Sequence, residues 1–283
     1  MDESYRHCEQ LVRAADKDRF LATLFAPADK RRALFAFYAF NREIAGVRAR
    51  AREPMPGEIR LQWWRDVLNG ERPGEAAANP VAAALTDTIA RFGLPVAPLL
   101  DLIEAHAFDL YDDPMPTLVA LEAYGRKTEG AVFRLAARIV VNNDDGALAA
   151  EHAGIASTIT GILRSFARHA SRRLVYVPLE LLDRHGGRIE DIYAGQVSPQ
   201  LHAALAALRN EARRHVAAFE SALPQLPSAA MPAFLPAALV PGHLAIMERP
   251  GYDPFRSAVE FAQWRRQWAL WWAARRYSRA MRG

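Results

Sequence analysis

Residues 31–50 read RRALFAFYAFNREIAGVRAR, and this stretch decides the fold class. Leu34, Phe37, Tyr38, Ile44 and Val47 fall mostly on one side of a 3.6-residue repeat, which is the pattern of an amphipathic helix with one buried face. The same period recurs outward along the chain, so the sequence predicts an all-α protein. The other predicted helices span residues 58–68, 80–92, 96–110, 118–141, 148–168, 199–223, 232–246 and 255–281.

Turn-forming segments separate these helices, namely ERPG at 71–74, DDP at 112–114, NNDDG at 142–146 and HGG at 185–187. Residues 174–177 alone read as a strand, and they are too few to build a sheet. Because no internal repeat or flexible linker divides the sequence, we expect residues 1–283 to form a single domain.

Composition narrows the class of protein further. With 51% hydrophobic and 24% charged residues among 283, the chain can bury a sizeable core, and wholesale disorder is excluded. A single cysteine, Cys8, excludes a disulfide framework and a thiolate-rich metal centre. The N-terminal residues MDESYRHCEQ lack a basic-then-apolar leader, and prolines interrupt the most apolar stretch, 231–247. We therefore expect a soluble, cytoplasmic protein, with peripheral contact to a membrane left open.

The excess positive charge lies at the C-terminus. The chain carries 36 basic and 32 acidic residues, and residues 261–283 contain no acid. Phe261, Trp264, Trp268 and Trp271 are spaced by three and four, which predicts an aromatic stripe on a basic helix, as is typical of helices that lie in a membrane interface. The alternative is that the stripe packs onto the core. The arginines here are Arg265, Arg266, Arg275, Arg276, Arg279 and Arg282, and those expected to contact a membrane or partner, beside the tryptophans, are Arg275, Arg276 and Arg279.

Motifs for catalysis are scarce. The sequence has no phosphate-binding glycine-rich loop, no G-x-S-x-G elbow and no H-E-x-x-H pair, and its eight histidines are scattered. Asp109, Asp112 and Asp113 in FDLYDDPMP could hold Mg²⁺ from one helix face. Since Pro114 follows at once, a helix end or turn is favoured over a metal site.

Four segments together resemble the squalene/phytoene synthase family in order and spacing. They are ALFAFYAFNREIAGVRARA at 33–51, LQWWRDVL at 61–68, GILRSFARHASRRLVYVPLELLDRHG at 161–186 and GYDPF at 251–255. The resemblance covers nearly the whole chain and implies an isoprenoid-synthase-type helical bundle around a central cavity. Active members of that family condense two prenyl diphosphates, using Mg²⁺ held by two aspartate-rich motifs.

The acids of both family motifs are missing here. The first motif is matched by Tyr38, Ala39, Phe40 and Arg42, and its acid positions hold Ala45, Gly46 and Ala49. The second is matched by residues 162–164, and its acid positions hold Ser165, Arg168 and His169. Neutral or cationic side chains cannot hold the Mg²⁺ that neutralises a departing diphosphate. The resemblance therefore predicts no metal site, no cofactor and no catalytic residue.

One branch of the family shares these departures. Residues 40–47, 62–64, 163–164, 171–178 and 232–236 are similar to the mitochondrial respiratory complex I assembly factor that resembles a phytoene synthase, and to its bacterial relatives. This similarity implies a catalytically inactive bacterial protein that binds or helps assemble a membrane-bound respiratory complex, without nucleic acid. Two alternatives stay open: a transferase acting on prenyl diphosphates through a rearranged site, and a carrier of a prenyl chain or lipid.

The resemblance also implies where a ligand would bind. If the two motif helices converge as in the family, the cavity mouth is positive without metal, and guanidinium groups could hold a phosphate or carboxylate directly. The alternative is that these arginines are solvated or pair with acids such as Glu43. The candidate ligand-binding residues are Tyr38, Arg42, Glu43, Arg164, Arg168, His169 and Arg172.

Overall fold

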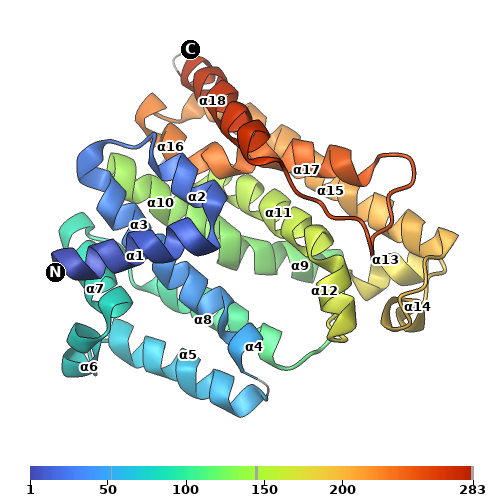
Figure 1. Ribbon diagram of the computed structural model, residues 1–283, viewed down its shortest axis with the longest axis horizontal. Helices are drawn as coiled ribbons and strands as arrows, with labels where there is room; N and C mark the ends of the chain where they lie inside the picture. The colour runs from blue at the N-terminus through green and yellow to red at the C-terminus, as the bar shows by residue number, and fades with distance from the viewer. Residues whose placement is uncertain (52, 144–145, 282–283) are drawn as a thin grey trace.

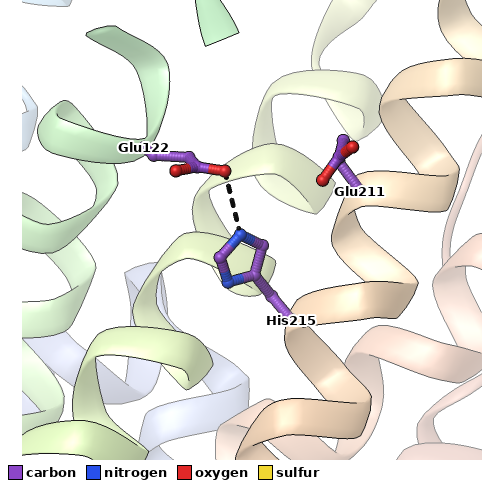
Figure 2. A group of neighbouring side chains, drawn as sticks. All are labelled: Glu122, Glu211 and His215. Carbon is purple, nitrogen blue, oxygen red and sulfur yellow. Dashed lines mark hydrogen bonds and ion pairs between the residues drawn. The ribbon is translucent and has the colours of Figure 1, made fainter. Parts of the chain in front are cut away.

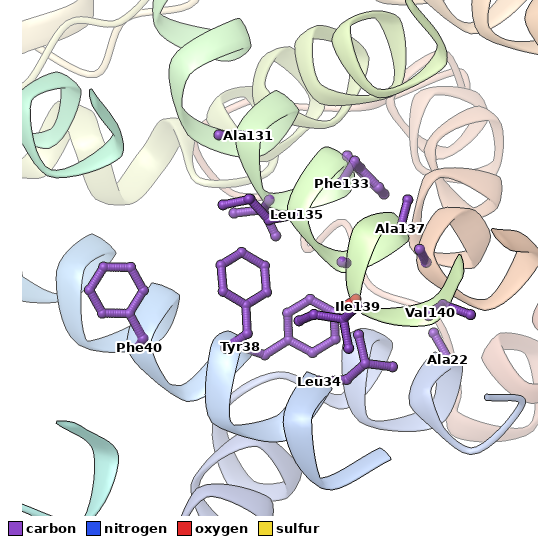
Figure 3. Close-up of a cluster of buried hydrophobic side chains, with 14 of the residues drawn as sticks. Ala22, Leu34, Tyr38, Phe40, Ala131, Phe133, Leu135, Ala137, Ile139 and Val140 are labelled. Carbon is purple, nitrogen blue, oxygen red and sulfur yellow. The ribbon is translucent and has the colours of Figure 1, made fainter. Parts of the chain in front are cut away.

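The helix predicted from residues 31–50 forms part of the core. In the computed structural model, which describes residues 1–51, 53–143 and 146–281, α3 (Ala28–Ala45) packs against α10 (Ala131–Val141). Leu34, Tyr38 and Phe40 of α3 are buried in this layer together with Phe133 and Leu135 of α10 (Figure 3). The apolar face read from the sequence is therefore the face that meets the core.

Helices account for the rest of the architecture. In the first half of the chain they are α1 (Asp2–Ala15), α2 (Lys17–Thr23), α4 (Val47–Arg50), α5 (Pro54–Leu68), α6 (Pro73–Ala78), α7 (Pro80–Phe92), α8 (Ala97–Ala107), η1 (Phe108–Leu110), α9 (Leu118–Gly125) and the π-helical turn η2 (Arg126–Gly130). In the second half they are α11 (Ala147–Arg164), α12 (Phe166–Ser171), α13 (Leu179–Arg184), α14 (Ile189–Tyr193), α15 (Pro199–Ala222), η3 (Leu223–Gln225), η4 (Ser228–Ala230), α16 (Met231–Phe234), η5 (Leu235–Leu239), α17 (Val240–Met247) and α18 (Gln263–Ala280).

These helices pack around two adjoining apolar clusters. In one cluster α1 and α7 pack on α3, and α10 lies beside them, whereas the other is built on the long pair α11 and α15 (Figure 1). Helix α18 lies along the outside of the bundle and contacts α2 and η5 (Figure 1). The all-α prediction is confirmed, since the described ranges contain no β-strand.

Local sequence signals fix several helix ends. Asn79 caps α7 by accepting hydrogen bonds from the backbone N–H groups of residues 81 and 82, and Gly93 ends that helix in the left-handed conformation. Ser198 caps α15 in the same way, with Pro199 at its first position. These short-range signals explain why the predicted bounds 80–92 agree with the structure.

The structure corrects the predictions at other positions. Residues 174–177 form no strand. Instead, Val175 accepts a single backbone hydrogen bond from Met115 at 2.9 Å. The predicted helix 148–168 ends at Arg164, because Ser165 adopts a non-helical conformation between α11 and α12. Helices α1 and α2 were not predicted, although Tyr5, Cys8 and Val12 have helical spacing and are buried.

The last predicted helix begins eight residues later than expected. Asp253 folds the preceding segment into a turn by accepting a hydrogen bond from the N–H of Phe255 at 2.8 Å. Phe261 then stacks on His243 of α17, with 4.3 Å between the ring centroids, so it lies outside α18. Arg282 and residues 144–145 of the predicted turn lie outside the described residues.

One helical run, 228–247, is long and apolar enough to cross a membrane by length and composition. Its mean hydropathy is 1.5, and 61% of it is buried inside the fold. A core helix of a soluble protein passes the same test, so this run is weak evidence for a membrane span.

Candidate functional site

A pocket of about 270 Å³ lies where the two family motif segments meet. Arg42 reaches it from α3, and Arg164 reaches it from the end of α11. The remaining walls come from α2, η2, α10, the rest of α11, η5 and α17. The lining residues are Asp16, Asp18, Arg19, Arg42, Glu129, Phe133, Ser157, Thr160, Gly161, Arg164, Pro236, Leu239, Val240 and His243.

Arg19 is the central ionic group of this pocket. Its backbone N–H binds the carboxylate of Asp16, which caps α2, and its guanidinium donates to Asp16 at 3.0 Å and to Glu129 of η2. The guanidinium also lies 5.3 Å from the ring centroid of Tyr38. Burial lowers the pKa of Arg19, but the carboxylates of Glu129 and Asp16 outweigh this effect and raise it above its usual value. Arg19 is therefore permanently charged and fully paired.

The pocket lining contains three arginines, Arg19, Arg42 and Arg164, and three acids, Asp16, Asp18 and Glu129, so the formal charges of these side chains sum to zero. The sequence analysis predicted a positive cavity mouth from the motif arginines alone. That prediction missed these acids, since they come from α2 and the π-helical turn, outside both motifs. All three acids are paired with Arg19 or with Arg266, which lies outside the lining, whereas no described carboxylate forms an ion pair with Arg42 or Arg164.

Four buried polar atoms of the described lining form no hydrogen bond: Oδ1 of Asp18, which is ion-paired with Arg266, and Nε of Arg42, Oγ1 of Thr160 and Nε2 of His243. Burial, followed by the charges of Arg164 and Arg266, lowers the pKa of His243 to about 3, so its ring is neutral at physiological pH. Buried polar groups are normally paired. Arg42, Thr160 and His243 together offer hydrogen-bond donors and acceptors to a small ligand.

The other predicted ligand-binding residues lie elsewhere. Glu43 pairs with Arg50 at 3.1 Å and with Arg60 at 2.9 Å, as the alternative of locally paired charges anticipates. Arg168 and Arg172 are exposed on and after α12, and Arg168 donates to Ser165 at 2.6 Å. The break at Ser165 separates them from Arg164, so these arginines do not converge on the pocket.

Asp109 organises a separate polar cluster. It accepts hydrogen bonds from Tyr176 at 2.7 Å and from Tyr124 at 3.1 Å, and His106 Nδ1 lies 2.8 Å from its carboxylate. His169 stacks on Tyr176 with 4.8 Å between the centroids. Burial and the Asp109 charge raise the pKa of Tyr176 far above its usual value. Asp109 therefore fixes three chain segments together.

Asp112 has a φ of 56° and pairs with Arg48, as expected for a turn.

A group with metal-ligating atoms lies between α9 and α15 (Figure 2). Glu122, Glu211 and His215 bring ligand atoms within 4.8 Å of one another, and His215 Nδ1 lies 2.9 Å from His152 Nδ1. Arg214 donates to Glu122 at 3.0 Å and to Glu211 at 2.7 Å, so it supplies positive charge to both carboxylates. The sequence analysis missed this group, although the spacing of four between Glu211 and His215 is a signal for it. None of the three lines the pocket.

The tryptophans of α18 face outward. Trp264, Trp268, Trp271 and Trp272 are 60%, 55%, 38% and 58% exposed, so the alternative that the stripe packs onto the core is wrong for these side chains. Arg275 and Arg279 lie on the same side, and Arg276 pairs with Glu220 at 2.8 Å. Arg266 is buried and pairs with Asp18 of α2 at 2.5 Å, which corrects its predicted place at the surface.

Comparison with known proteins agrees with these motifs. The squalene/phytoene synthase family model matches residues 12–272. The chain is 28% identical over 259 residues to the NADH dehydrogenase (ubiquinone) complex I assembly factor 6 of Rattus norvegicus, covering 91% of this chain and 78% of the relative. It is 26% identical over 284 residues to the 15-cis-phytoene synthase of Synechococcus elongatus, covering 95% and 92%.

The fold is also found in a solved structure. A dehydrosqualene synthase in complex with a ligand superposes with a TM-score of 0.86 at 21% identity, covering 97% of this chain and 96% of that chain. The two folds therefore match over nearly their whole length although most residues differ. This match confirms the predicted isoprenoid-synthase-type bundle.

Proposed function

The chain belongs to the squalene/phytoene synthase family, and we propose that within this family it is a non-catalytic binding factor in the assembly of a membrane-bound respiratory complex. The observation that carries the proposal is the chemistry of the two motif segments. Ala45, Gly46 and Ala49 stand at the first set of acid positions, and Ser165, Arg168 and His169 stand at the second. No carboxylate from either set is left to hold Mg²⁺ against a diphosphate.

The acids that do line the pocket support the same proposal. Glu129 and Asp16 are engaged by Arg19, and Asp18 is engaged by Arg266. A carboxylate that already pairs with a guanidinium would have to give up that partner before it could bind a cation. At about 270 Å³ the pocket also lies below the usual range for drug-sized ligands, whereas a condensation needs room for two prenyl chains. This pocket by itself is therefore small for the two chains of a condensation.

The proposed partner follows from the relative of highest similarity reported above, whose name describes an assembly factor of complex I. We place the protein in a bacterial cytoplasm at the inner face of the membrane, where it would meet a membrane-bound complex or its assembly intermediates. The pocket then serves as a binding site for a small polar group, held by Arg42, Thr160 and His243.

Incubation with farnesyl or geranylgeranyl diphosphate and Mg²⁺ tests the loss of catalysis. We expect no diphosphate release, with a phytoene synthase as the positive control. Release at a rate comparable to that control would refute the proposal.

Deletion of the gene in its host should also leave complex I subassemblies on native gels, and re-expression of the chain should restore the full complex. Normal complex I in the deletion strain would refute the assembly role.

A further inference from the structure

The outward face of α18 has an unusual composition for a surface helix. At 100° per residue, the buried residues Arg266, Leu270, Ala273, Ala274 and Tyr277 fall on one side. The opposite side carries four exposed tryptophans mixed with exposed arginines. A surface helix normally turns its polar side to solvent. Exposed indole rings contribute little to the stability of the fold, so this face is typical of a surface that binds a partner outside the bundle.

A second segment extends the same face. Leu24 and Phe25, which follow α2, are 42% and 37% exposed. Together with Trp268 and Trp271 they line an apolar groove of about 560 Å³ between the end of α2 and α18. We call Leu24, Phe25, Trp264, Trp268, Trp271 and Trp272 the tryptophan face. Its two parts are far apart in sequence, so only the fold brings them together.

Arginines without an acidic partner among the described residues border the tryptophan face. Arg275 lies 3.7 Å from the ring centroid of Trp271, and Arg265 lies 5.2 Å from that of Trp264. In the described part of the chain, no carboxylate forms an ion pair with Arg265, Arg275 or Arg279, and α18 itself contains no acid. The face therefore combines amphipathic rings with unneutralised positive charge.

We propose that the tryptophan face binds the surface of a bilayer that contains anionic lipids. Indole rings partition to the boundary between headgroups and acyl chains, and arginines near such a surface are attracted to it. A second copy of the chain fits less well, because a two-fold contact would set the arginines of one face against those of the other. The inference extends the membrane-side location proposed above, but its test needs neither diphosphate nor a respiratory complex, so either proposal can fail alone.

Flotation with vesicles tests the inference. We expect the protein to bind phosphatidylcholine vesicles that contain phosphatidylglycerol, and to bind them less at high salt or without the anionic lipid. The R265E/R275E/R279E variant should partition at least about 100-fold more weakly, since three attractive contacts become repulsive. The matched control R6E/R249E/R256E changes the net charge equally at exposed arginines outside the face and should bind like the wild type.

A second variant separates lipid from protein partners. W268S/W272S should bind vesicles more weakly and should show less quenching of tryptophan fluorescence by brominated lipid, because only Trp264 and Trp271 remain on the face, while its thermal melting stays close to that of the wild type. Equal vesicle binding by the wild type and R265E/R275E/R279E would overturn the inference. So would a wild-type dimer in analytical ultracentrifugation that W268S/W272S dissociates, because the face would then bind a second copy.

Discussion

Replacing Arg266 with methionine should destabilise the fold, because Arg266 fixes α18 to α2 through a largely buried ion pair. Its Nε lies 2.5 Å from the Asp18 carboxylate, and the two side chains are 8% and 22% exposed. Removal of one partner from a buried pair costs about 3–5 kcal/mol. Since Asp18 retains some contact with solvent, we expect a loss at the lower end of this range, about 3 kcal/mol of unfolding free energy at neutral pH. This corresponds to a fall of about 6 °C in Tm for a chain of this size.

The same variant should depend on pH in a defined direction. Burial raises the pKa of Asp18, and the charge of Arg266 opposes that rise. Without Arg266 the folded-state pKa moves further up. Above pH about 4 the folded state then binds more protons than the unfolded state, so the free energy of unfolding falls as pH rises. The loss of unfolding free energy in R266M, relative to the wild type, should therefore be larger at neutral pH than near pH about 4.5.

Urea unfolding followed by circular dichroism measures both effects. The double variant D18N/R266M removes both charges and should recover most of the lost free energy of unfolding, because a neutral pair leaves no buried charge uncompensated. A loss of less than about 1 kcal/mol in R266M would refute this account of the anchor. An equal deficit at both pH values would also refute it, since the cost would then not come from the Asp18 carboxylate.

Three further predictions follow from the polar clusters. D109N should lose about 1.5–3 kcal/mol of unfolding free energy, measured by urea unfolding, because neutral amides accept weaker hydrogen bonds from Tyr124 and Tyr176; Y124F should lose less. In the wild type the free energy of unfolding should fall by up to about 1.4 kcal/mol per pH unit below pH about 6.5, because His243 binds a proton in the unfolded state but stays neutral when buried. H243F should lack this part of the pH dependence, and an unchanged pH dependence would refute the prediction. In calorimetry R214A should bind Zn²⁺ more tightly than the wild type, because Glu122 and Glu211 lose the cation that pairs with them. Equal affinities would show that Arg214 does not compete with the metal. The control R214A/H215A should bind Zn²⁺ more weakly than R214A, because it lacks the histidine ligand.

Periodicity predicted the helical class because each helix has an apolar face that must be buried. It could not predict the pocket. Asp16 and Glu129 are far apart in sequence, and they come together only because both bind Arg19. The break at Ser165 was equally hidden, since residues 148–168 keep a helical pattern through it. Such features depend on tertiary contacts rather than on local propensity.

The orientation of α18 shows the same limit. Spacing places Trp264, Trp268 and Trp271 on one side of a helix, but it does not say whether that side faces the core or solvent. The structure decides this with a different set of residues, because Leu270 and Tyr277 fill the core-facing side. The buried Arg266 also faces inward, and no charge pattern in the segment distinguishes it from the exposed arginines.

The proposed loss of the metal site fits the charges that lie around the pocket. Two sets of carboxylates that face one another repel unless a cation lies between them, so a metal-dependent site stores electrostatic strain in its empty form. Here small or basic side chains occupy those positions, and the remaining acids Asp16, Asp18 and Glu129 are each matched by an arginine. One of these matches, Asp18 with Arg266, also holds α18 in place. An acid of the pocket lining thus helps to present the tryptophan face on the outside of the bundle.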